Sequence, residues 1–451
     1  MRIHQLESIG LDQPRSAETE IYRKITRRIM PLLFVAYLCA FLDRINIGYA
    51  QLQMKTDLGF SAATYGLGAG IFFVSYLLFE VPSNVLLERI GARLTLLRIM
   101  VLWGLTSAGT MFVSTPAQFY VARFLLGLFE GGFFPGMILY LTYWYPSTRR
   151  GAVTGQFMFA VPVAGIVGGP LSGWIMSSLD KVGGLEGWRW LFLIEGLPTT
   201  LFGIVCFLLL RDRPADADWL TDSEKELVER VLRTDVGRPA PGGGGASHQM
   251  RKALTDIQVW VLAFIYFACA CASYVYMFWL PTMIKDLGVS DVARIGWYAA
   301  IPGAFGGAGV LLITRSSDRH GERRWHVGGS LIMAAILLLA TTMVPSSAPS
   351  SIAMGLAIFS ACGFFLLGAV IAYWSIPPTY LSADAAAVGI ALISSIGVVG
   401  GFVGPTLLGF TKDATGGFTL GVCIVAAIMI AGGLVTLLGL PRSATRVGAR
   451  V

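Results

Sequence analysis

Long apolar runs recur along almost the whole chain and restrict its fold more than any other feature. Each run has about twenty residues, enough for an α-helix to cross the roughly 30 Å hydrocarbon core of a bilayer. Continuous apolar runs predict helices, because backbone groups in lipid need partners within the span. Only 14% of the 451 residues are charged, against roughly 25% in soluble domains. We therefore expect an all-α polytopic membrane protein embedded in the lipid bilayer.

Twelve spans fit these runs, with a long hydrophilic loop after the sixth. We place the spans near residues 29–53, 65–87, 95–114, 117–142, 150–178, 190–210, 256–284, 293–315, 326–345, 351–380, 385–411 and 417–440. The expected units are an N-terminal tail (1–28), a six-helix bundle (29–210), a middle loop (211–255), a second six-helix bundle (256–440) and a C-terminal tail (441–451).

The lysines and arginines divide unequally between the two sides of this arrangement. Of the 34, 26 lie on the side of the N-terminal tail, six lie on the opposite side, and Arg44 and Arg123 lie within spans. The positive-inside rule then places both termini and the middle loop in the cytoplasm. This topology also accounts for the net charge of +7, so we expect no nucleic-acid partner. The polar first 28 residues favour insertion by the first span over a cleavable signal peptide.

The remaining composition points to no cofactor. The six cysteines all lie in apolar runs, where we expect small hydrophobic side chains and no disulfides. The four histidines lack the spacing of a metal site. In the middle loop, the spacing of Thr221 and Glu224 predicts a capping box that opens a short helix to about Arg233. Residues 239–247, rich in proline and glycine, predict a flexible tether.

The two halves of the chain resemble each other. Residues 88–93 and 318–323 both follow the pattern acidic-Arg-x-Gly-x-Arg, 230 positions apart, and Gly169-Pro170 and Gly404-Pro405 form a second echo, 235 apart. Repeated halves with a site between them are typical of secondary transporters. The acidic-Arg loops predict a latch at the cytoplasmic face, although the positive-inside signal alone could explain them. The candidate gating residues are Glu88, Arg89, Arg93, Asp318, Arg319 and Arg323.

Four segments carry a resemblance to a known family. They are residues 41–48 (FLDRINIG), 79–84 (FEVPSN), 127–136 (GLFEGGFFPG) and 187–192 (GWRWLF). With them, nearly the full chain resembles the major facilitator superfamily, and within it the anion:cation symporters, which import tartrate, galactonate, phthalate and hydroxyphenylacetate. The resemblance implies two pseudo-symmetric six-helix bundles in a bacterial inner membrane, a small organic anion as substrate, and protons as the coupling ion.

A charged residue inside a span costs free energy, so its presence there indicates a function. Arg44 is our candidate for the substrate anion, because a guanidinium grips a carboxylate through two hydrogen bonds. Asp43 and Glu130 can change protonation state. The resemblance implies that these two acids carry protons and that Arg123 couples them. Buried ion pairs that only hold spans together, such as Asp43–Arg123, are the alternative. For Glu80, beside a proline, we favour a structural pairing.

Uncharged residues would complete the pocket. Tyr76 and Trp374 match pocket positions of the subfamily. Phe41, Ser394 and Val398 stand where relatives often carry more polar residues, which favours an aromatic or less hydroxylated acid over a sugar acid. The full set of candidates, each of which could instead serve packing, is Tyr76, Tyr274, Tyr276, Tyr373, Trp374, Ser394 and Ser395.

Three functions remain for comparison. A proton-driven importer of a carboxylate anion is favoured by the buried arginines. An exporter of drugs or metabolites with the same fold is the alternative, and Gly168-Gly169-Pro170 partly echoes an exporter signature. A membrane enzyme or receptor is disfavoured, because the longest hydrophilic stretch is too short for a catalytic domain. We expect a monomer.

Overall fold

The computed structural model describes residues 4–235, 251, 253–345, 350–380 and 383–440. Eleven helical segments in this part of the chain are long and apolar enough to cross a membrane. A shorter apolar segment, Trp325–Thr341, supplies the twelfth. The predicted all-α membrane fold with twelve spans is confirmed.

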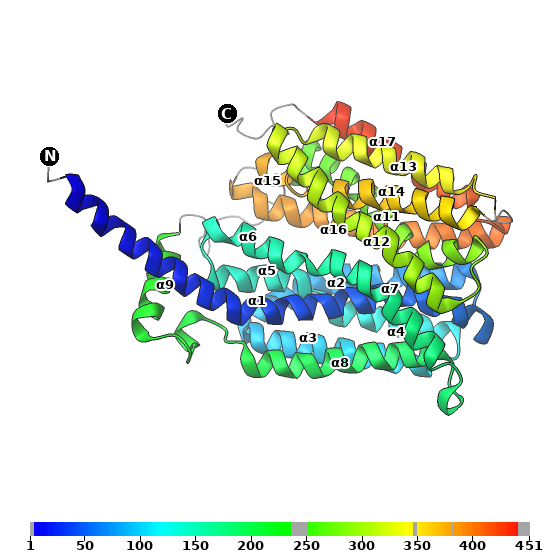
Figure 1. Ribbon diagram of the computed structural model, residues 1–451, viewed down its shortest axis with the longest axis horizontal. Helices are drawn as coiled ribbons and strands as arrows, with labels where there is room; N and C mark the ends of the chain where they lie inside the picture. Colours follow the sequence, from blue (N-terminus) through cyan, green and yellow to red (C-terminus); the bar gives the residue numbers. More distant parts are fainter. Residues whose placement is uncertain (1–3, 236–250, 252, 346–349, 381–382, 441–451) are drawn as a thin grey trace.

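The helices form two bundles that lie side by side (Figure 1). The first contains α1 (His4–Asp57), α2 (Ala62–Ile90), α3 (Ala92–Gly109), α4 (Pro116–Glu130), α5 (Phe133–Trp144), α6 (Ser147–Met158), α7 (Ala160–Ser178) and α8 (Gly187–Leu209). The second contains α11 (Ile257–Asp286), α12 (Val292–His320), η4 (Trp325–Gly329), α13 (Ser330–Thr341), α14 (Ser351–Tyr373), α15 (Pro377–Tyr380), α16 (Ala383–Thr415) and α17 (Thr419–Gly439). Short 3-10 turns lie at η1 (Thr110–Phe112), η2 (Val182–Gly184) and η3 (Pro214–Asp216).

The middle loop contains the predicted helix, α9 (Asp222–Thr234). Its capping box is present: the Thr221 hydroxyl accepts from the backbone of Glu224, and the Glu224 carboxylate accepts from the backbone of Thr221 at 2.8 Å. Lys24 of α1 also donates to Glu224 at 2.7 Å, and this hydrogen bond holds the pKa of Glu224 below its ordinary value. The ion pair fixes α9 beside the first part of α1 (Figure 1). The predicted tether at 239–247 lies outside the described residues.

Several spans that the sequence predicted as continuous are each built from two helices, and two of these spans lie in the first bundle. In the first, α4 stops at Glu130 and α5 begins at Phe133, because Gly132 takes a left-handed backbone with φ of 88°. A side chain could not fit there either, since a Cβ on Gly132 would lie 2.5 Å from Cβ of Ser83 on α2. The break therefore places Glu130 at a helix end, close to α2. The second break separates α6 from α7 at Phe159.

Small residues let the bundles approach each other. α2 packs on α16, and α7 packs on α12. A Cβ on Gly169 of α7 would lie 2.5 Å from the carbonyl oxygen of Gly296 on α12, so only glycine allows this approach. Gly66 of α2 lies in the same way against the backbone of Pro405 on α16. The two glycine-proline pairs, in α7 and α16, thus lie where helices of the two bundles pack closely.

Hydrogen bonds join the bundles at the end away from the start of α1. The Asp413 carboxylate accepts from the backbone nitrogens of Ala62 and Ala63, at 3.0 and 2.7 Å, and so caps α2 from the other bundle. Tyr65 donates to the carbonyl oxygen of Phe278 at 3.0 Å. We call these contacts the distal latch. In the part of the chain that the structure describes, no ion pair crosses between the bundles.

Candidate functional site

Arg44 of α1 forms an ion pair with Glu130, at the end of α4. Three aromatic rings surround its guanidinium, with centroids at 5.2 Å for Phe41, 5.4 Å for Phe72 and 5.7 Å for Tyr76. The Arg44 side chain is 11% exposed, whereas Glu130 is 1% exposed. Arg44 is therefore the more accessible member of a charged pair set among aromatic faces, where a cation is favoured.

Each partner keeps one buried atom without a hydrogen bond. These atoms are Nε of Arg44 and Oε2 of Glu130. Buried polar atoms that lack a partner are costly, and they are tolerated mainly where function needs them. The pair can therefore accept a further group that offers an acceptor to the guanidinium and a proton to the carboxylate.

Arg123 lies on α4, two turns before Glu130, and is buried. Its guanidinium lies 5.1 Å from the centroid of the Phe72 ring and donates to the carbonyl oxygen of Gly68 at 3.4 Å. Among the described residues, Arg123 forms no ion pair. The alternative of an Asp43–Arg123 ion pair that holds spans together is therefore not seen.

Asp43 points away from Arg44, as expected for neighbours on a helix. It accepts hydrogen bonds from Ser107 of α3 at 2.8 Å, from Thr199 of α8 at 3.3 Å and from Asn46 of α1 at 3.3 Å. It is 1% exposed. The two charges of α1 thus face different surroundings: Arg44 faces α2 and α4, and Asp43 faces α3 and α8.

A further buried acid, Glu195 of α8, was not among the predicted site residues. Its carboxylate is 7% exposed, accepts from Ser172 of α7 at 3.2 Å and also contacts the side chain of Asn46. The sequence feature that could have identified Glu195 is the one that identified the other acids, namely a carboxylate in the middle of an apolar span. Glu195 lies in residues 190–210, where we predicted a span without weighing its charge.

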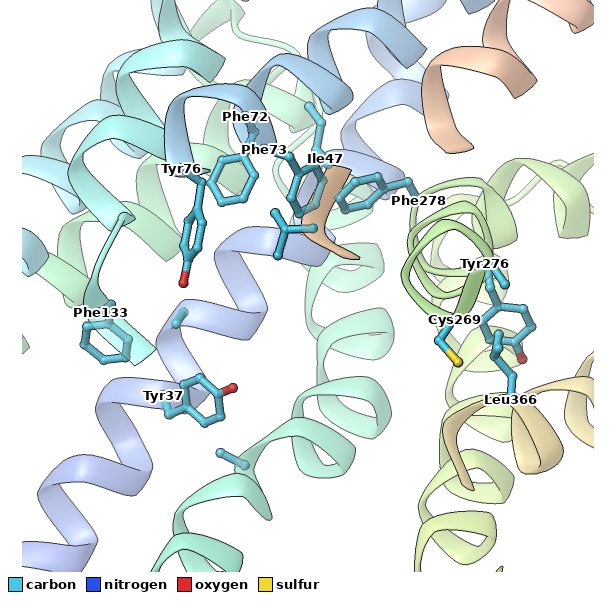
Figure 2. Packing of buried hydrophobic residues seen from close by; sticks show 14 of the residues in the cluster. Tyr37, Ile47, Phe72, Phe73, Tyr76, Phe133, Cys269, Tyr276, Phe278 and Leu366 are labelled. Carbon is cyan, nitrogen blue, oxygen red and sulfur yellow. The ribbon is translucent and has the colours of Figure 1, made fainter. Parts of the chain in front are cut away.

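Aromatic side chains from both bundles meet beside this site. Phe73 of α2 lies beside Phe278 of α11, as Figure 2 shows, with ring centroids 6.2 Å apart. The ring centroids of Phe73 and Tyr274 of α11 are 4.2 Å apart. Tyr274 also lies near Arg44, whose charge acts on its hydroxyl group. Two predicted pocket residues, Tyr76 and Tyr274, are therefore beside Arg44, one from each bundle.

Other predicted pocket residues have different surroundings. Tyr373 is buried and donates to the carbonyl oxygen of Leu262 at 2.8 Å, and Tyr276 donates to that of Phe359 at 2.7 Å. Both hydroxyl groups join helices within the second bundle. Trp374 is partly exposed, and its ring packs edge-on against Tyr266. Ser394 and Ser395 lie on α16 and are partly exposed.

The acidic-Arg loops make contacts within their own bundles. Arg93 donates to the carbonyl oxygen of Phe207 at 2.8 Å, while its backbone nitrogen donates to Asp212. Arg323 donates to the carbonyl oxygen of Ser375. The described structure therefore has the bundles joined at the distal latch and shows no hydrogen bond between them at the candidate gating residues.

Glu80 of α2 lacks the structural pairing that we favoured. It forms no ion pair with any described residue, and its Oε2 atom is buried without a partner. Its backbone carbonyl accepts from Asn84 at 2.9 Å, which is a contact within the helix. Pro82 lies two residues further along and cannot donate a backbone hydrogen bond.

Comparison with known proteins gives consistent matches over nearly the full length. A sequence profile described as Major Facilitator Superfamily matches residues 33–405. The chain is 44% identical over 410 residues to "Putative metabolite transport protein NicT" of Pseudomonas putida, covering 91% of this chain and 92% of that protein. It is 44% identical over 435 residues to "Putative tartrate transporter" of Agrobacterium vitis, covering 96% and 98%.

A third relative bears a different name. The "Quinolone resistance transporter" of Acinetobacter baumannii is 38% identical over 420 residues, with 93% of this chain and 94% of that protein covered. Among solved structures, a bacterial homologue of the human lysosomal transporter Spinster, in an inward-facing and occupied conformation, matches with a TM-score of 0.72. That match covers 94% of this chain and 98% of the other at 17% identity, so it supports the fold alone.

Proposed function

The chain belongs to the Major Facilitator Superfamily, and we propose that it carries a small organic carboxylate anion into the cell together with protons. It is a multi-pass membrane transporter and not an enzyme. The finer statements on anion class, proton coupling, direction of transport and cytoplasmic termini rest on the residues around Arg44 and on the distribution of positive charge. The relatives named for tartrate and metabolite transport support an organic anion.

The observation that carries this proposal is the Arg44–Glu130 ion pair among aromatic rings. An arriving carboxylate that binds Arg44 competes with Glu130 for the positive charge of the same guanidinium. Glu130 then loses its counter-charge inside an apolar bundle, where an unpaired carboxylate is costly. Uptake of a proton by Glu130 removes that cost. Binding of the anion and binding of the proton therefore favour each other, which is the linkage that symport requires.

The aromatic surroundings favour a particular kind of acid. Phe41, Phe72 and Tyr76 face the guanidinium, so apolar ring faces surround the charge that would bind the acid. We therefore propose an aromatic or sparsely hydroxylated carboxylate over a sugar acid. Tyr76 of one bundle and Tyr274 of the other lie near Arg44, which supports a substrate site between the two bundles, as expected for alternating access.

Uptake into proteoliposomes tests this proposal. The purified chain is reconstituted, and uptake of labelled tartrate, phthalate, 4-hydroxyphenylacetate and galactonate is measured with and without an inward proton gradient. We expect at least one acid to accumulate several-fold above equilibrium with the gradient, and a protonophore to abolish the accumulation. Uptake that is independent of the gradient would contradict proton coupling.

The relative named for quinolone resistance supports one alternative, export of an aromatic compound. Transport in inside-out vesicles separates the two functions. An exporter would accumulate a fluorescent quinolone in such vesicles when they are energised, whereas the proposed importer would not.

A further inference from the structure

We propose that Asp43, Asn46 and Glu195 form a second ion site in the first bundle, which holds one proton for its two carboxyl groups. This site deepens the proposed proton coupling and rests on it for its role in transport. It lies on the other side of α1 from the anion site, because Asp43 and Arg44 are neighbours that face different helices. Glu195 is a member that the sequence analysis did not include.

Asn46 connects the two acids. Its amide nitrogen donates to Oδ1 of Asp43 at 3.3 Å, and its side chain also contacts the carboxyl group of Glu195. Thr199 of α8 lies beside both residues, with its hydroxyl 3.3 Å from Oδ2 of Asp43 and 3.1 Å from the backbone carbonyl oxygen of Glu195, one turn earlier on the same helix. Four helices, α1, α3, α7 and α8, thus meet around this pair.

The pair has no positive partner. In the described part of the chain, neither Asp43 nor Glu195 forms an ion pair. Two ionised carboxylates that share a dry site repel each other and lose their hydration, so such a pair retains a proton. Either a proton or a metal cation must therefore neutralise the site.

Two buried oxygen atoms point to where that ion binds. Oε2 of Glu195 and Oδ1 of Asn46 have no hydrogen-bond partner, and both residues are more than nine-tenths buried. Both atoms are acceptors when Glu195 is ionised. A proton on Glu195 turns its carboxylate into a hydroxyl donor, which is the group that this cluster of acceptors lacks.

Proton binding suits the surrounding groups better than binding of sodium. The hydroxyls of Ser107 and Ser172 donate toward the carboxyl oxygens, and Asn46 presents its NH₂ group to Asp43. A metal cation needs oxygen lone pairs directed at it, as hard cations are bound by oxygen ligands. Here the neighbours direct hydrogen atoms at the acids. The other titratable or charged groups that face the pair from nearby helices are Cys39, Tyr49, Arg123 and Glu130.

Infrared spectroscopy on the full chain tests the site without any substrate. Difference spectra between acidic and alkaline buffers should show the carbonyl band of a protonated carboxyl group that responds to D₂O. Glu195→Gln and Asp43→Asn should each remove or shift this band, since loss of either carboxyl group changes how the proton is held. Glu186→Gln should retain it, because Glu186 is a matched carboxylate on the exposed start of the same helix, paired with Lys181 at 2.8 Å. A band that both site variants leave unchanged would overturn the proposal.

A second experiment tests whether the site binds sodium instead of a proton. Thermal unfolding of the wild type is compared in sodium chloride and in N-methylglucamine chloride at equal ionic strength. We expect equal midpoints. A higher midpoint in sodium that disappears in Glu195→Gln would assign the site to sodium and overturn the proposed proton.

A transport experiment tests whether the Asp43–Glu195 site takes part in proton coupling. Glu195→Gln should lower proton-driven accumulation of the transported acid about tenfold while exchange of labelled for unlabelled acid at equal pH continues. If accumulation is unchanged, the pair does not take part in coupling. If the wild type moves no acid with protons, the proposed function fails, while the infrared result still decides whether the pair binds a proton.

Discussion

The guanidinium of Arg44 has two roles in the proposed mechanism. It neutralises Glu130, and it is the charge on which a substrate carboxylate can bind, between the rings of Phe41 and Phe72. A planar guanidinium can stack on rings and offer several hydrogen atoms at the same time. The ammonium group of a lysine is a compact charge that cannot stack on rings while it donates a forked pair of hydrogen bonds.

Arg44→Lys tests this residue. We expect the affinity for the transported acid to fall tenfold or more, about 1.4 kcal/mol, because the forked grip and the ring contacts are lost together. Binding is measured by the shift in thermal unfolding midpoint across a series of acid concentrations. Arg233→Lys is the control, because Arg233 forms an exposed ion pair with Glu229 on α9, away from the site. Equal affinity in wild type and Arg44→Lys would move the anion site elsewhere.

At the scale of helices, the break between α4 and α5 and the distal latch have different roles. The break sets Glu130 beside α2. The next residue, Gly131, packs so closely there that a Cβ on it would lie 3.1 Å from the carbonyl oxygen of Tyr76. The distal latch joins the bundles through the N-terminus of α2, where a negative charge is favoured by the helix dipole. Asp413 supplies that charge from α16, so the latch stabilises only the state in which this end is closed.

Asp413→Asn tests the latch. The loss of one charge at a helix N-terminus costs roughly 0.3–1 kcal/mol, so we expect the share of molecules that are open at this end to rise up to about fivefold. Spin labels at Thr56 and Ala414, on a background without native cysteines, report the distance distribution across this end. Asp291→Asn is the matched control, because Asp291 caps α12 within its own bundle through Ala293 at 3.0 Å. If both variants give the wild-type distribution, Asp413 does not hold the bundles together.

At the scale of the whole molecule, composition and charge predicted most of the architecture. Twelve apolar runs, the repeated loops and the capping box at Thr221 all correspond to observed elements. The break at Gly132 was not predicted, because hydropathy does not change where a glycine alters the backbone direction. The distal latch was also missed, since Asp413 is far from Ala62 in sequence and only packing brings them together.

The site was predicted in part. Intramembrane charge identified Arg44, Asp43, Arg123 and Glu130, and the structure brings Arg44 and Glu130 together. The partners of each acid could not be derived, because a helical period gives a face and not the neighbouring helix. Glu195 could have been found by the same reasoning that selected Glu130.

The central claim is that Glu130 exchanges Arg44 for a proton when the anion binds. Transport by Glu130→Gln in proteoliposomes tests it most directly, with accumulation under an inward proton gradient and exchange without a gradient measured on the same preparation. The glutamine side chain is neutral at every pH and leaves Arg44 free for the anion. We therefore predict that exchange continues while proton-driven accumulation is lost. Accumulation at the wild-type level would contradict the claim and leave Glu130 as a structural partner of Arg44.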